Sequence, residues 1–155
     1  MEKILVIDFG SQYNQLIVRR VRESGVYSEL ISPDVEIESL KEMINDGSLK
    51  GIILSGGPDV ITDEDSLKMN SDIFELGIPI LGVCYGMQYM SNYYGEQVIE
   101  SDVKEYGNND ITIKSNNALT LNLPTNQTVW MSHGYHVEVG DKVFDQIAFS
   151  NNGHL

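Results

Sequence analysis

The stretch Ile78-Pro-Ile-Leu-Gly-Val-Cys-Tyr-Gly-Met-Gln88 contains the change of pattern on which the interpretation of the whole chain depends. An apolar run of strand type, Ile80 to Val83, leads directly into Cys84, the only cysteine, and glycines stand two positions before it and two after it, at Gly82 and Gly86. The spacing behind Cys84 is helical. At such a corner the side chain projects from the end of the sheet, and the turn is too sharp for flanking Cβ atoms. The pattern predicts a nucleophile elbow with Cys84 at its tip.

The role of Cys84 has two interpretations at this point. A lone cysteine is more often a small buried apolar residue than a nucleophile. The helix expected behind it would direct its positive end at the sulfur and favour the reactive thiolate. The other segments of the chain have to decide between the two.

Length and composition indicate one globular domain over residues 1–155. Hydrophobic residues make up 41% and charged residues 21%, which is ordinary for a soluble protein. The first residues show no signal-peptide pattern, no apolar stretch approaches the ~20 residues needed to span a bilayer, and one cysteine forms no internal disulfide. These features predict a cytoplasmic location.

The formal net charge is −13, from 23 acidic and 10 basic residues. Phosphate backbones and anionic lipids repel such a surface, so we expect neither nucleic acid nor a membrane as a partner. A basic protein partner and a purely solubilising role of the charge both stay open.

No pair of residues has the spacing of a common metal motif. His133 and His136 are three positions apart, but no cysteine or carboxylate cluster of ligand spacing stands near them. We therefore expect no metal and no cofactor in this domain.

The first two thirds of the chain alternate between strand and helix patterns. This cadence predicts right-handed βαβ units and hence an α/β fold with an open, mostly parallel sheet and helices on both faces. The predicted strands are 3–8, 26–31, 51–54 and 78–83, and the predicted helices are about 13–21, 37–44, 69–76 and 85–94.

After Gly95 the pattern changes to short segments separated by Asn- and Gly-rich turns. Such segments indicate antiparallel hairpins, which we expect at the edge of the sheet. They cover residues 97–99, 111–113, 119–121, 129–131 and 146–150.

Three motifs follow strands of the predicted sheet directly: Asp8-Phe-Gly-Ser11, Ser55-Gly-Gly-Pro58 and Cys84. Ligands of open α/β sheets bind outside the carboxyl ends of the strands, where these motifs would meet. A thiolate attacking a carbonyl group needs N–H donors for the oxyanion, and the Tyr85 amide and the Gly56-Gly57 pair could supply them. For the glycine pair alone, a simple turn is the commoner role.

These residues resemble the class I (triad) glutamine amidotransferases, and among them the glutaminase domain of the GMP synthase family. The resemblance covers essentially the whole chain and includes Lys104-Glu-Tyr-Gly107. The four blocks that carry it are Ile7-Asp-Phe-Gly-Ser-Gln-Tyr13, Ile53-Leu-Ser-Gly-Gly-Pro58, Gly82-Val-Cys-Tyr-Gly-Met-Gln88 and Val129-Trp-Met-Ser-His-Gly134.

The resemblance implies a flavodoxin-like fold and hydrolysis of L-glutamine. Cys84 would be the nucleophile, and the backbone amides of Gly57 and Tyr85 would form the oxyanion hole. The substrate-binding residues would be Gly56, Gln88, Ser132, His133 and Gly134.

The resemblance also implies a partner. Ammonia would pass to an ATP-pyrophosphatase domain or subunit of a GMP synthase, which aminates XMP with ATP and Mg²⁺. The Ser-Gly-Gly-Val-Asp-Ser loop of that domain does not occur in these residues, so we expect the partner elsewhere.

Two departures from the family pattern bear on activity. Tyr135 stands where the family usually has an Asp that helps to hold the substrate. The His-Pro-Glu motif that completes the triad does not occur, and neither His133 nor His154 is a convincing replacement, because a base needs an orienting partner. We therefore expect a glutaminase domain that is incomplete at its C-terminus and nearly inactive alone.

Two other hypotheses stay open. The chain could be a non-catalytic pseudo-amidotransferase that binds glutamine or a synthetase. It could also be a different cysteine hydrolase on a flavodoxin-like sheet.

Overall fold

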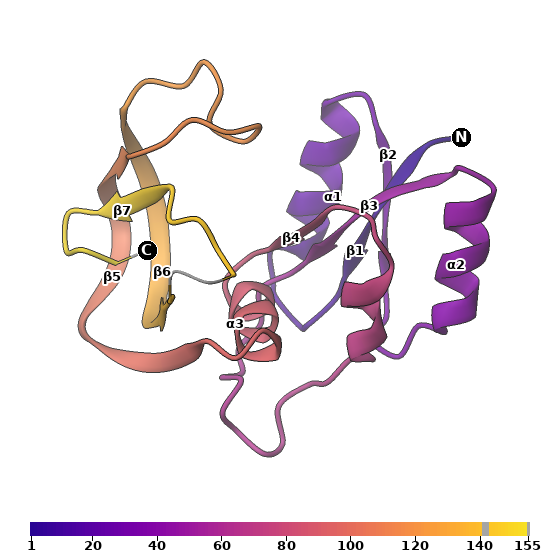
Figure 1. The fold of residues 1–155 in the computed structure, drawn as a ribbon, viewed down its shortest axis with the longest axis horizontal. Coiled ribbons are helices and arrows are strands. Elements are labelled where there is room, and N and C mark those ends of the chain that lie inside the picture. The colour runs from indigo at the N-terminus through magenta and orange to yellow at the C-terminus, as the bar shows by residue number, and fades with distance from the viewer. Residues whose placement is uncertain (141–142, 155) are drawn as a thin grey trace. The chain divides into compact units, whose positions relative to one another are not determined.

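The computed structural model describes residues 1–140 and 143–154, and the chain divides into two compact units (Figure 1). The first unit is Met1–Tyr93 and the second begins at Tyr94. Each unit is described by itself below. The single domain expected over residues 1–155 stays a prediction.

The first unit contains a four-stranded parallel sheet. Its strand order is β2-β1-β3-β4, so the chain crosses from one side of β1 to the other between β2 and β3. This order confirms the predicted α/β fold with an open parallel sheet. The strands are β1 (Lys3–Ile7), β2 (Tyr27–Ile31), β3 (Leu49–Leu54) and β4 (Ile80–Gly82).

Three α-helices lie where the sequence predicts them. Each is followed by a glycine in the left-handed region, with φ values of 86° at Gly25, 77° at Gly47 and 87° at Gly95. No helix in the described part of the chain is long and apolar enough to cross a membrane. The helices are α1 (Asn14–Glu23), α2 (Ile37–Asn45) and α3 (Tyr85–Tyr93).

The core of the first unit covers both faces of the sheet. On one face Val6 packs with Val18 of α1 and Ile53 of β3, and all three are buried. Leu5 and Ile7 alternate to the other face, where they are 1% and 0% exposed. The continuously apolar sequence of β1 follows from this burial on two sides.

The helix predicted over 69–76 is wrong in extent. The structure has a single 3₁₀ turn, η1 (Ser71–Glu75), which begins after Asn70. Met69 is excluded from it because both of its backbone groups bond to the Tyr89 hydroxyl, at 3.3 Å for N–H and 2.9 Å for C=O. A tertiary contact therefore overrides the helical spacing of the apolar residues.

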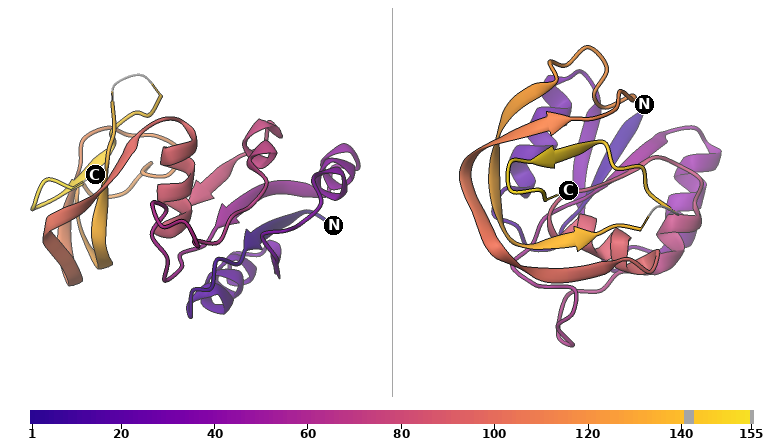
Figure 2. Two further views of the ribbon diagram at one scale, coloured as in Figure 1. Left: turned by 90° about the horizontal axis from the view of Figure 1, so that it is seen from below. Right: turned by 60° about the vertical axis from the view of Figure 1, so that its left-hand side comes forward.

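The second unit contains a separate three-stranded antiparallel sheet in the order β6-β5-β7. The segments predicted at 97–99 and 111–113 are the two ends of one strand, β5 (Gln97–Ile113). It runs beside β6 (Asn126–Glu138) as a long curved ribbon, and β7 (Ala148–Ser150) pairs with the end of β5 (Figure 2). The predicted antiparallel pairing is confirmed, but these strands form their own sheet.

The strand predicted over 119–121 is wrong. Residues 119–121 form a turn in which the backbone N–H groups of Thr120 and Leu121 donate to the Asn117 carbonyl, at 3.2 and 2.9 Å. The Asn117 side chain also accepts from the Leu119 N–H group, at 2.8 Å. Local asparagine hydrogen bonding therefore outweighs the alternation of leucine and threonine.

Candidate functional site

Cys84 lies between the last residue of β4 and the first residue of α3. Its φ is 50°, in the left-handed region that a residue with a Cβ atom adopts at a cost of order 1–3 kcal/mol. Its carbonyl accepts the Gln88 N–H group at 3.0 Å and so starts the helix. The local geometry is the strained strand-to-helix turn that the sequence predicts, with the sulfur at the helix N-terminus.

The glycines on either side of Cys84 are required by close backbone contacts. A Cβ atom on Gly86 would lie 2.3 Å from the Leu54 carbonyl oxygen, and one on Gly82 would lie 2.7 Å from Met87 Cα. Neither neighbour is a flexible side chain. The two glycines are therefore needed because α3 packs closely on Gly82 and β3 packs closely on Gly86.

The loops after β1 and β3 meet beside the turn. A Cβ atom on Gly57 would lie 2.4 Å from the Phe9 carbonyl oxygen, and one on Gly56 would lie 3.4 Å from Cys84 Cβ. The Asp8 carboxylate accepts the Gly10 N–H group at 2.8 Å, which tightens the loop after β1. The predicted convergence of the three strand-end motifs is confirmed.

Several backbone N–H groups near Cys84 have no acceptor within the described residues, and those of Gly57 and Tyr85 are among them, beside those of Gly56, Cys84 and Met87. Tyr85 is the first residue of α3, where the N–H group has no partner inside the helix. The neighbouring Gly86 N–H group differs, because it donates to the Ser55 carbonyl at 3.0 Å. The N–H groups of Gly57 and Tyr85 are therefore free to donate, and their role as the oxyanion hole stays a prediction.

Gln88 is 4% exposed, and its Oε1 atom is buried without a hydrogen-bond partner in the described part of the chain. Such a buried acceptor calls for a donor. The residue lies one helical turn after Cys84, so an N–H group of a bound molecule is a suitable partner.

The Tyr85 side chain has a structural role. The ring is fully buried, lies 5.0 Å from that of Phe9 in an edge contact, and its hydroxyl donates to the Leu67 carbonyl. Burial raises the pKa of this phenol. Only the backbone of Tyr85 is therefore available to a reacting group.

Ser55 is a residue that the sequence interpretation did not select. It is 0% exposed, and its Oγ atom accepts the Phe9 N–H group at 2.9 Å and donates to the Gly56 carbonyl at 2.8 Å. The Ser-Gly-Gly-Pro motif gave the available signal, but a turn serine and a buried one look alike in sequence.

Ser132, His133 and Gly134 lie on β6 in the second unit, and their contact with the Cys84 group stays a prediction. Both ring nitrogens of His133 face oxygen atoms. Nε2 lies 2.9 Å from Glu105 Oε2, and Nδ1 lies 3.0 Å from the Tyr135 carbonyl. The ring therefore fixes the path of β6 rather than offering a free nitrogen.

Glu105 was also missed as a site residue. It is 2% exposed, and it accepts the Asn152 side-chain amide at 2.8 Å. Burial raises the pKa of this carboxyl, but hydrogen bonds from Ser150 and Asn152 and the charges of His133 and His154 outweigh it, so the pKa is lowered overall. Only its place in Lys104-Glu-Tyr-Gly107 hinted at a role.

The model of the family called Glutamine amidotransferase class-I matches residues 5–155. The chain belongs to this family. A GMP synthase [glutamine-hydrolyzing] of Lactobacillus acidophilus is 52% identical over 152 residues, which are 97% of this chain and 29% of that protein. One from Bacillus pumilus is 56% identical over 133 residues, which are 86% of this chain and 25% of that protein.

A solved structure is also similar. A Thermoplasma acidophilum protein described as a GMP synthase subunit superposes with a TM-score of 0.84 at 28% identity, covering 99% of this chain and 75% of that one. The predicted family and fold class are thus confirmed. The amidotransferase chain spans less than a third of the length of the curated relatives it matches.

Gly134 of the amidotransferase lies opposite an irregularity in β5. Glu100 pairs with Tyr135 and Glu105 with His133, so four residues of β5 face one of β6. A Cβ atom on Gly134 would lie 3.2 Å from the Lys104 side chain. The bulge is what brings Glu105 opposite His133.

His154 and His136 are also held by hydrogen bonds within the second unit. His154 Nε2 lies 3.0 Å from the Val103 carbonyl oxygen, and His136 Nδ1 lies 2.7 Å from Ser101 Oγ. Within the described ranges, no group of three or more His, Cys, Asp or Glu residues could hold a metal ion.

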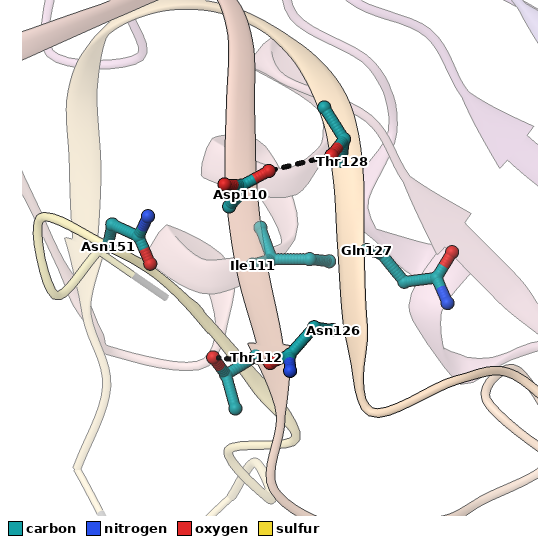
Figure 3. Close-up of a pocket in the computed structure, with 7 residues that line it drawn as sticks. All are labelled: Asp110, Ile111, Thr112, Asn126, Gln127, Thr128 and Asn151. Carbon is teal, nitrogen blue, oxygen red and sulfur yellow. Dashed lines mark hydrogen bonds between the residues drawn. The ribbon is translucent and has the colours of Figure 1, made fainter.

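A hollow on the second unit is lined by polar residues of β5 and β6 (Figure 3). Asp110 accepts the Thr128 hydroxyl there at 2.7 Å, and Thr112 bonds to Asn126 at 3.3 Å. None of the predicted site residues lines it, and the Gln127 side chain there donates to the Pro124 carbonyl at 2.8 Å. The hollow therefore adds nothing to the candidate site.

Proposed function

We propose that this chain is the glutaminase part of a GMP synthase, whose reaction is the hydrolysis of L-glutamine to glutamate and ammonia, and that these residues alone are nearly inactive because they do not include the His-Pro-Glu motif. The observation that carries the proposal is the strained turn at Cys84, with φ of 50°, beside two backbone N–H groups that lack an acceptor in the described structure. Strain of this kind is retained where a side chain has to be presented to a substrate.

The proposed chemistry forms and breaks one thioester. The Cys84 thiolate attacks the side-chain amide carbon of glutamine, a C–S bond forms, and the carbonyl electron pair moves to oxygen. The Gly57 and Tyr85 N–H groups stabilise this oxyanion. Collapse breaks the C–N bond, the nitrogen takes a proton from water and leaves as ammonia, and the hydroxide so formed cleaves the thioester to glutamate and free thiolate.

The remaining residues would bind the substrate. The unpartnered Gln88 oxygen accepts an N–H group of glutamine, and the backbone of Ser132, His133 and Gly134 forms a second wall. Gly56 leaves room beside Cys84. Tyr135 offers no carboxylate to the substrate ammonium group, which lowers the affinity expected for glutamine.

The use of the ammonia is proposed from the relatives. Those proteins are GMP synthases more than three times as long as the match, so a synthetase domain or subunit that aminates XMP with ATP and Mg²⁺ is the partner we propose. No cofactor is needed for the thioester chemistry itself.

The test is acylation of Cys84 by the γ-para-nitrophenyl ester of L-glutamate. Nitrophenolate leaves without a proton, so this step needs no general acid. We expect a burst of one nitrophenolate per chain, a glutamyl adduct on Cys84 in the intact mass, and neither in Cys84→Ala. The D-glutamate ester is the control for specific binding, and equal reaction of both enantiomers would contradict the proposal.

A second candidate is a non-catalytic amidotransferase that binds glutamine. It is favoured by Tyr135 and by the engagement of both His133 ring nitrogens with oxygen atoms. This candidate predicts saturable binding of L-glutamine by calorimetry with no acylation of Cys84.

A further inference from the structure

We propose that Ser55 is a positioning residue that holds the Gly56–Gly57 peptide so that its N–H group faces the oxyanion. The inference rests on the proposed glutaminase reaction and names a residue that does not itself touch the substrate. Ser55 is completely buried at the end of β3, and every polar group it has is hydrogen-bonded.

The hydroxyl of Ser55 sets the direction of one peptide plane. Its Oγ atom donates to the Gly56 carbonyl at 2.8 Å. The peptide bond between Gly56 and Gly57 is trans, so its N–H group points opposite to its carbonyl group. Fixing the Gly56 carbonyl toward Ser55 therefore directs the Gly57 N–H group away from Ser55, where it finds no acceptor in the described residues.

The direction of the Ser55 hydroxyl is itself fixed. Its oxygen accepts the Phe9 N–H group at 2.9 Å, which leaves the hydroxyl hydrogen for the Gly56 carbonyl. Two consecutive glycines without Cβ atoms would otherwise allow the peptide to turn over at little steric cost. The buried Ser55 hydroxyl accepts one hydrogen bond and donates another, and these two bonds prevent the Gly56–Gly57 peptide from turning over.

Ser55 is also hydrogen-bonded to Gly86, the residue after Tyr85, whose N–H group is the second proposed oxyanion donor. The Ser55 carbonyl accepts the Gly86 N–H group at 3.0 Å, one residue after Tyr85, and the Ser55 N–H group donates to the Ile7 carbonyl at 3.2 Å. Ser55 thus connects the end of β1, the glycine loop and the first turn of α3. Hydrogen bonds of Ser55 therefore help to position both proposed donors, the Gly57 N–H group through its side chain and the Tyr85 N–H group through its backbone.

The experiment compares two reactions of Cys84 in wild type and Ser55→Ala. Acylation by the γ-para-nitrophenyl ester of L-glutamate passes through an oxyanion, whereas alkylation by iodoacetamide displaces iodide and forms none. We expect Ser55→Ala to slow acylation by about 10- to 100-fold, less than the roughly 10²–10³-fold loss from deleting a donor. The iodoacetamide rate should change less than about twofold, as expected when no oxyanion forms.

Ser28→Ala is the matched control, because Ser28 is also 0% exposed but its hydroxyl has no partner within the described residues. It should leave both rates unchanged. If Ser55→Ala fails to fold, Ser55→Thr, which keeps the hydroxyl, should retain the wild-type ratio of the two rates. Equal slowing of both reactions, or an unchanged acylation rate, would overturn the inference.

A separate measurement distinguishes failure of the proposed glutaminase function from failure of the positioning role of Ser55. The Gly57 amide signal in nuclear magnetic resonance reports the orientation of the peptide without any substrate. If wild type is not acylated, the glutaminase proposal fails, and an altered Gly57 amide environment in Ser55→Ala still supports the positioning role. A Gly57 signal identical in both proteins would overturn it.

Discussion

At the scale of single residues, the glycines around Cys84 are needed because neighbouring backbone atoms lie too close for a Cβ atom. Gly86 packs against the Leu54 backbone, so a side chain there would push α3 away from the end of β3. Gly57 packs against the Phe9 backbone, so a side chain there would push apart the loops after β3 and β1. The strain at Cys84 is sustained because these contacts determine the path of the turn on both sides.

The first prediction at this scale concerns Gly86→Ala. The added Cβ atom would lie 2.3 Å from the Leu54 carbonyl oxygen, so we expect a loss of unfolding free energy of about 1–3 kcal/mol, as for overpacked sites. Urea denaturation measures it. Gly140→Ala is the control, because among the described residues its Cβ atom would meet the Glu96 side chain alone, at 3.6 Å. Equal effects of the two substitutions would contradict the packing argument.

At the scale of elements, α3 is attached to the preceding segment by tyrosines spaced one helical turn apart. Tyr85 bonds to the Leu67 carbonyl, Tyr89 to both backbone groups of Met69, and Tyr93 to the Glu75 carboxylate at 2.6 Å. Tyr89 also stacks on Phe9 at 5.8 Å. The helix that carries Cys84 thus orders the long acidic loop before it.

Tyr89→Phe tests this attachment. The ring contacts remain, but the Met69 N–H and C=O groups lose their partner in a buried place, which costs about 1–3 kcal/mol. We expect faster hydrogen exchange at the Met69 amide and faster proteolysis within residues 59–68. Tyr13→Phe serves as the control, since Tyr13 is 57% exposed. An unchanged hydrogen-exchange rate of the Met69 amide in Tyr89→Phe would contradict the proposed role of Tyr89 in holding this segment on α3.

At the scale of the molecule, each unit depends on a different kind of interaction. The first unit has apolar strands buried on both faces of a parallel sheet. In the second unit, a buried carboxylate at Glu105 joins β5 to His133 of β6 and to Asn152 beyond β7. The folding of the second unit should therefore respond to acid.

The acid response is predicted from the lowered pKa of Glu105. A carboxyl group whose pKa is lower in the folded state stabilises the fold above its unfolded pKa of about 4.3 and loses that contribution as the pH falls through the folded value. We expect Glu105→Gln to be less stable at pH 6 by about 1–3 kcal/mol and to show a flatter decline toward pH 3.

The comparison for this prediction is Glu100→Gln on the same strand. Glu100 is paired with Lys104 at 2.9 Å, but its side chain is 61% exposed, so the change should be small at every pH. Unfolding by urea between pH 3 and pH 6 gives both profiles. Parallel profiles of wild type and Glu105→Gln would contradict the assignment.

Several features of this protein follow from the sequence by itself. The order of strands and helices in the first unit, their glycine stops and the turn at Cys84 are all local patterns, because periodicity and glycine placement act within a few residues. The meeting of three strand ends also follows, because parallel strands present their carboxyl ends on one edge.

Only the tertiary structure decided the rest. Ser55 and Glu105 acquire their roles from partners 46 and 28 positions away, at Phe9 and His133, and the short motifs in which they stand do not tell a buried polar side chain from a surface one. Met69 lies outside the helix predicted for it because its backbone bonds to the hydroxyl group of Tyr89, 20 positions away. Burial and long-range hydrogen bonds, which no local pattern records, are the physical reason.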